Sequence, residues 1–87
     1  MNVKNMISKN GNSIANQFVI TDGNVEYFQS YDSVIVKREN GKVTLDREFW
    51  DYSNTTGKYR NLFLGETKKE TEKKINSGEY ILANLNN

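Results

Sequence analysis

The chain of 87 residues contains no cysteine, no histidine and no proline. Without cysteine there is no disulfide and no thiolate to bind a metal. Without histidine, most zinc and transition-metal sites, every histidine-based catalytic triad and the usual general base near neutral pH are excluded. The sequence therefore predicts a protein without a metal or another cofactor, and we expect it not to be an enzyme.

Long apolar runs are missing as well, and none approaches the roughly 18 residues that a membrane span requires. The N-terminal segment MNVKNMISKNGN lacks the apolar core of a signal peptide. The formal net charge is +1, so bulk charge indicates no particular partner. We expect one small domain over residues 1–87, located in the cytoplasm, with no membrane partner.

The strongest turn signal is Asn40-Gly41, a dipeptide typical of two-residue β-hairpin turns. A turn there pairs Val36 with Leu45. In this register one strand face becomes apolar, while Ile35 points to the opposite face. The residues predicted on the apolar face are Val34, Val36, Val43 and Leu45.

Asp22-Gly23 predicts an earlier hairpin. Its register would pair Ile20 with Val25. Farther from the turn, Phe18 would pair with Tyr27, and side-chain alternation would place all four residues on one face.

Turn-prone residues from Ser30 to Ser33 separate the two hairpins. Together these signals predict a four-stranded antiparallel meander over about residues 14–48. Upstream of it, Val3, Met6 and Ile7 have the i, i+3, i+4 spacing of a short amphipathic helical turn.

Two helices are predicted after the meander. The first is capped by Asp51 or Ser53 and ends at Leu64 before Gly65. The second starts with the capping box formed by Thr67 and Glu70 and ends at Ser77-Gly78. The apolar stripe of the first helix consists of Tyr59, Leu62 and Phe63.

A last strand is predicted over Glu79–Leu85. The expected fold class is thus α+β, with an antiparallel sheet of four to five strands and two helices between the fourth strand and the C-terminal strand. The edge of the last strand leaves self-association open.

The segment Phe49–Glu66 is the candidate working surface, because it is both strongly aromatic and strongly polar. Core packing accounts for aromatic side chains in most small domains. Tyrosine, tryptophan and arginine are, however, also the residue types enriched at binding hot spots. The predicted protein-binding residues are Trp50, Tyr52, Lys58, Tyr59, Arg60 and Asn61.

The second helix offers an alternative, a nucleic-acid-binding surface made of lysines. Interleaved glutamates also fit the ordinary solvated face of a helix. The lysines that would contact nucleic acid are Lys68, Lys69, Lys73 and Lys74.

Two patterns resemble parts of catalytic sites. Asp46 and Glu48 share one face of a predicted strand, as paired acid–base or Mg²⁺-binding carboxylates do. Glu66-Thr67-Lys68 matches the E-x-K half of a metal-dependent nuclease motif, but it lies at a helix cap rather than on a strand. Surface carboxylates and helix caps explain both patterns better than catalysis does.

Over roughly residues 27–86, the chain resembles a family of short proteins carried by phages and mobile elements of Gram-positive bacteria. The segments that carry the resemblance are Tyr27–Tyr31, Val43–Asp46, Trp50–Ser53, Thr55-Thr56, Lys58–Asn61 and Phe63–Glu66. That family has no assigned enzymatic activity. The resemblance implies an accessory protein that binds and inhibits a host protein in the bacterial cytoplasm. An anti-CRISPR protein acting on a CRISPR effector is one example of this class.

Overall fold

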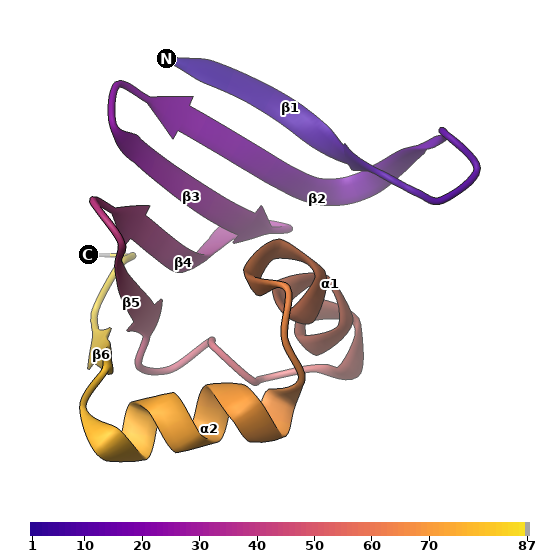
Figure 1. Ribbon diagram of the computed structural model, residues 1–87. Coiled ribbons are helices and arrows are strands. Elements are labelled where there is room, and N and C mark those ends of the chain that lie inside the picture. Colours follow the sequence, from indigo (N-terminus) through magenta and orange to yellow (C-terminus); the bar gives the residue numbers. More distant parts are fainter. Residues whose placement is uncertain (87) are drawn as a thin grey trace.

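The computed structural model describes residues 1–86, which form one six-stranded sheet with both helices against the same face (Figure 1). The spatial order of the strands follows the sequence, from β1 at one edge to β6 at the other. The strands are β1 (Asn2–Ile7), β2 (Ser13–Asp22), β3 (Val25–Ser30), β4 (Ser33–Glu39), β5 (Lys42–Asp46) and β6 (Tyr80–Ala83). The helices are α1 (Asn54–Leu64) and α2 (Lys68–Ser77).

The hairpin at Asn40-Gly41 is confirmed in its register, since Val36 lies opposite Leu45 in the β4–β5 pair. Asn40 and Gly41 have φ values of 52° and 79°. A type I′ turn needs positive φ at both central positions, and asparagine followed by glycine meets this need at the lowest steric cost.

The first hairpin exists, but its predicted register was wrong. Asp22 pairs with Val25, and Ile20 pairs with Tyr27 rather than with Val25. The turn is therefore Gly23-Asn24, with Gly23 at φ 61° in the first central position. Glycine is favoured there in a type II′ turn, which explains why the turn forms one residue later than Asp22-Gly23 predicts.

A β-bulge in β4 changes the predicted faces of the β3–β4 pair. Phe28 lies opposite Val36 and Gln29 lies opposite Val34, which leaves Ile35 as the extra residue. Ile35 and Val36 are both fully buried although they are neighbours in sequence. The placement of Val34 on the buried face and of Ile35 on the other was wrong, because a bulge interrupts strict alternation.

The N-terminal segment is a strand, so the predicted helical turn was wrong. β1 pairs antiparallel with β2, and a register shift lies between Asn5 and Ile7. Met6 is buried in the core, whereas Val3 is exposed. Apolar spacing over so few residues does not separate helix from strand, and the long partner strand β2 supplies the hydrogen bonds that decide it.

Both predicted helices and their caps are confirmed. Ser53, rather than Asp51, caps α1 by accepting a hydrogen bond from the Thr56 N–H, and Gly65 follows the last turn. Thr67 and Glu70 form the predicted capping box of α2.

The last strand is also confirmed, but β6 runs parallel to β5. Parallel neighbours need a crossover connection, which α1 and α2 supply. The α+β class is confirmed. The two helices precede the final strand as predicted, but they follow the fifth strand rather than the fourth. The antiparallel sheet of four to five strands was wrong, since β1 adds a strand and β6 makes the sheet mixed.

The core lies between the sheet and the helices, with Phe28 stacked on Phe63 of α1 at a centroid distance of 5.8 Å. The strand register places Phe18, Ile20 and Tyr27 on the opposite face, which no helix covers (Figure 1). Within residues 1–86, neither helix is long and apolar enough to cross a membrane.

Candidate protein-interaction surface

The segment Phe49–Glu66 starts in a turn after β5 that is fixed by the buried carboxylate of Asp46. Its Oδ2 accepts hydrogen bonds from the Phe49 and Glu48 N–H groups at 2.9 and 3.1 Å. Its Oδ1 accepts from the Leu85 N–H at 2.8 Å. Burial alone would raise the pKa of Asp46, but these hydrogen bonds outweigh burial and hold the pKa below its ordinary value.

This arrangement gives Asp46 a structural role and separates it from Glu48. Both oxygens of Asp46 are occupied by backbone N–H groups, whereas the side chain of Glu48 is exposed. Within the described part of the chain, no group of three or more acidic, histidine or cysteine residues is placed to hold a metal ion.

Arg60, predicted at the binding surface, is buried with only 1% of its area exposed. Its Nη1 donates to the Trp50 carbonyl at 2.6 Å and to Asp51 Oδ1 at 3.1 Å. Its Nη2 donates to Asn61 Oδ1 at 2.9 Å. Arg60 therefore positions the turn and α1.

Asp51 joins this cluster to the second helix. Its Oδ2 lies 2.6 Å from Lys68 Nζ, while Oδ1 faces Arg60. Burial would raise the pKa of Asp51, but the hydrogen bonds and charges of Lys68 and Arg60 lower it. Lys68 therefore forms an ion pair within the chain.

The remaining aromatic residues of the turn differ in exposure. Trp50 is half-buried beneath the Arg60 guanidinium, which lies 5.1 Å from its ring centroid. Tyr52 is 47% exposed and packs edge-on against Phe49 at 5.4 Å. Trp50, Arg60 and Asn61 thus form one packed cluster, while Tyr52 remains on the surface.

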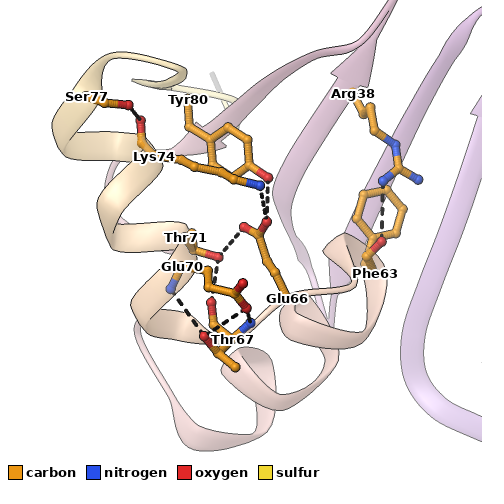
Figure 2. Close-up of polar contacts among 9 residues, drawn as sticks. All are labelled: Arg38, Phe63, Glu66, Thr67, Glu70, Thr71, Lys74, Ser77 and Tyr80. Carbon is orange, nitrogen blue, oxygen red and sulfur yellow. Dashed lines mark hydrogen bonds and ion pairs between the residues drawn. The ribbon is translucent and has the colours of Figure 1, made fainter.

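The lysines of α2 do not form one basic surface. Lys74 Nζ lies 2.7 Å from Glu66 Oε1, whose side chain is only 6% exposed (Figure 2). Glu66 also accepts hydrogen bonds from the hydroxyls of Thr71 at 2.6 Å and Tyr80 at 3.0 Å. Lys69 and Lys73 are exposed on the helix.

Glu66 is therefore the centre of a polar network that ties the α1–α2 link to α2 and β6 (Figure 2). Burial would raise its pKa, but hydrogen bonds from Lys74, Thr71 and Tyr80 together lower it. The hydrogen bond to Glu66 is also the main reason that the pKa of Lys74 is raised. Of the E-x-K pattern, Glu66 thus belongs to this network, whereas Lys68 pairs with Asp51.

The other predicted residues, Lys58 and Tyr59, line a groove between α1 and the β1–β2 hairpin. Its volume is about 560 Å³. In Figure 1 this hairpin extends well beyond the ends of β3 and β4, past α1. We call this hollow the hairpin–helix groove, and its lining residues are Ile7, Ser8, Lys9, Asn10, Ile14, Lys58, Tyr59 and Leu62.

The hairpin–helix groove has an apolar interior. Ile14 and Tyr59 are partly buried and pack against the core. Ile7 and Leu62 are each 56% exposed. Leu62 belongs to the predicted apolar stripe of α1, but core packing does not account for it, because it lies on the side of α1 that faces this groove and solvent.

The walls of the groove are held by internal hydrogen bonds. On the hairpin side, Asn5 Nδ2 donates to the Ile14 carbonyl at 2.9 Å. The loop between β1 and β2 is closed by the Ser8 N–H, which donates to the Asn12 carbonyl at 2.8 Å. The other wall is the regular helix α1, so backbone and side-chain hydrogen bonds within the chain fix both walls of the groove.

Comparison with models of known protein families identifies the family of this chain. The model of a family of unknown function, DUF8033, matches residues 1–79. The chain belongs to the DUF8033 family. No curated protein and no solved structure matches it.

Membership of DUF8033 confirms the expectation of a family without an assigned activity. The match also includes the N-terminal strands, which the resemblance over residues 27–86 left out. Those strands and the loop between them contribute the groove residues that sequence reasoning missed, Ile7, Lys9 and Ile14. The one available signal was their apolar and basic character next to a glycine-containing turn, which did not reveal that they lie beside α1.

Proposed function

We propose that this DUF8033 member is a non-enzymatic accessory protein that binds a host protein through the hairpin–helix groove. The observation that supports this proposal is the groove itself. It combines exposed Ile7 and Leu62, half-buried Tyr59 and the lysine Lys58 in one preformed hollow. Exposed apolar side chains gathered in a concave surface are typical of interaction sites.

The biological setting in this proposal is a phage or mobile element, with the protein acting in the cytoplasm of its bacterial host. The support is the resemblance of Trp50–Glu66 and the preceding segments to short phage and mobile-element proteins. Within this proposal the protein inhibits its partner by occluding a surface, as an anti-CRISPR protein does with a CRISPR effector. The groove suits this role because occlusion requires shape and contact but no catalytic group.

A pull-down from the lysate of a Gram-positive host tests the proposal. The wild-type chain is expected to retain a host protein that Leu62→Asp loses. Lys73→Glu is the matched control, because it also places an acid on an exposed helical position but lies outside the groove. Circular dichroism establishes that each variant is folded.

An assay of phage plating or CRISPR interference in the host then tests inhibition. The wild-type chain should relieve interference and Leu62→Asp should not. Identical sets of retained proteins for all three chains, with no effect on the host, would contradict the proposed function.

The nucleic-acid alternative has less support. Two of its four residues, Lys68 and Lys74, are engaged in ion pairs with Asp51 and Glu66. Only Lys69 and Lys73 are left to form the basic surface, and a stable electrostatic footprint requires more cations. A gel shift at low salt that disappears in the Lys69→Glu, Lys73→Glu double variant would favour this alternative instead.

A further inference from the structure

The charges around the hairpin–helix groove are all of one sign. Two lysines line it, Lys9 from the β1–β2 loop and Lys58 from α1, and no acidic residue does. Both lysines are exposed. The chain as a whole carries almost equal numbers of basic and acidic residues, so this uniform sign is a local property of the groove.

Lys58 lies directly beside the apolar interior. Its Nζ is 5.3 Å from the centroid of the Tyr59 ring, a cation–π distance. Lys58 and Leu62 are four positions apart on α1, and therefore occupy the same side of the helix. An apolar contact with Leu62 and a charged contact with Lys58 can thus be made by neighbouring groups of one ligand.

The size of the groove sets a further limit on what it holds. Its volume of about 560 Å³ falls inside the range of roughly 300–1,000 Å³ that is usual for ligand pockets. This is room for a few side chains of a peptide. A membrane surface fits a hollow poorly, because membrane-binding side chains must project from the protein.

From the apolar interior and the cationic lining we infer that the groove binds an acidic peptide segment of the partner protein. Apolar side chains of the segment occupy the space between Ile7, Ile14, Tyr59 and Leu62. Its carboxylates contact Lys9 and Lys58. This inference rests on the proposed function and adds the chemistry of the partner to it.

A library of random short peptides displayed on phage, selected against the purified chain, tests this inference. Peptides enriched on the wild-type chain should combine aspartate or glutamate with leucine, isoleucine or phenylalanine. The Lys9→Glu, Lys58→Glu double variant should enrich basic apolar peptides instead. The Lys69→Glu, Lys73→Glu double variant has the same net charge change away from the groove and should select the same peptides as the wild type.

Fluorescence anisotropy with the most enriched acidic peptide measures how much each substitution weakens binding. Reversing both groove lysines should weaken its binding about tenfold or more, and raising the salt concentration should weaken binding to the wild type. Leu62→Asp should weaken it as well. The control double variant should bind within about twofold of the wild type.

Several outcomes would overturn the inference. Enriched peptides without an excess of acids, or an unchanged selection after reversal of Lys9 and Lys58, would show that charge plays no part. Binding to vesicles of phosphatidylglycerol that Leu62→Asp abolishes, together with no enrichment of acidic peptides, would assign the groove to a membrane. If Leu62→Asp still abolishes capture of a host protein in any of these cases, the proposed function stands and only the acidic partner is wrong.

Discussion

The Asp51 carboxylate and the Arg60 guanidinium meet at 3.1 Å beneath the turn that leads into α1. Arg60 is nearly inaccessible to solvent, whereas the residues on either side of it, Tyr59 and Asn61, are partly exposed. The residues of the segment Phe49–Glu66 therefore fall into two groups, one around this ion pair and one at the groove. One side holds the turn in place, and the other side contributes Lys58, Tyr59 and Leu62 to the hairpin–helix groove.

Removing the Arg60 side chain is expected to destabilise the protein strongly. Arg60→Ala removes the donor to the Trp50 carbonyl and one of the two cations that face Asp51, while Lys68 remains at 2.6 Å. We expect a loss of about 2–4 kcal/mol in the free energy of unfolding, because a large buried side chain and its hydrogen bonds are lost. Arg60→Lys keeps the charge but loses the forked geometry, so it should recover only part of this loss. Urea denaturation measures both. Lys58→Ala, an exposed position two residues earlier, is the control and should change stability by less than about 0.5 kcal/mol. Equal effects of Arg60→Ala and Lys58→Ala would refute the structural role of Arg60.

Glu66 makes the stability of the protein depend on pH in the acidic range. Its pKa in the folded state is lowered below the ordinary value of 4.5, so its stabilising effect is complete above that value and is lost as the pH falls through the folded pKa. Glu66→Gln should lower the free energy of unfolding by about 1–2 kcal/mol at neutral pH and make its decline in acid shallower. Thermal denaturation between neutral and strongly acidic pH measures this. Glu72→Gln, at an exposed position of α2, should leave both the stability and its acid dependence nearly unchanged.

Asp46 should be important for holding the C-terminal segment against the end of β5. Asp46→Asn replaces one accepting oxygen by an amide group, which cannot accept a hydrogen bond from a backbone N–H. We expect a loss of about 1–3 kcal/mol and faster hydrogen exchange at the Leu85 amide, whose acceptor is Asp46 Oδ1. Glu48→Gln tests a nearby carboxylate that is exposed, and it should leave Leu85 exchange unaltered. Unchanged exchange in Asp46→Asn would argue against the anchoring role.

Gly57 is a position where a substitution should stabilise the protein. A Cβ atom there would lie 3.6 Å and 3.7 Å from the Arg60 guanidinium nitrogens, an ordinary contact distance. Alanine is favoured over glycine within a helix, so Gly57→Ala should raise the free energy of unfolding by about 0.5–1 kcal/mol. Gly41→Ala is the opposite case, because φ is 79° at this turn position and alanine is strained there by about 1 kcal/mol. Differential scanning calorimetry of both variants checks the signs, and a lower melting temperature for Gly57→Ala would contradict the expectation.

Local chemistry along the chain accounts for the features that sequence reasoning predicted correctly. The Asn40-Gly41 turn, the Ser53 cap and the Thr67–Glu70 capping box each depend on groups only a few residues apart. Their geometry is therefore almost independent of the rest of the fold. The α+β class follows from the order of these elements along the chain.

The predictions were wrong where contacts with distant segments determine the local structure. The apolar spacing of Val3, Met6 and Ile7 suits a helical turn, but pairing with the long strand β2 makes this segment a strand. The bulge at Ile35 depends on the packing of β4 against β3, and the parallel direction of β6 depends on the two helices that precede it. None of these is encoded within a short window.

The sequence by itself determined the Asn40-Gly41 turn, the Thr67–Glu70 capping box, the two helices before the last strand and the absence of cysteine and histidine chemistry. Only the tertiary structure decided which aromatic and charged residues are accessible. Arg60 is enclosed because Asp51 and the Trp50 carbonyl surround it, while Lys58 and Tyr59 face a groove whose other wall comes from the N-terminal hairpin. The physical reason is that burial and groove formation depend on contacts between segments far apart in the chain, which local propensity does not specify.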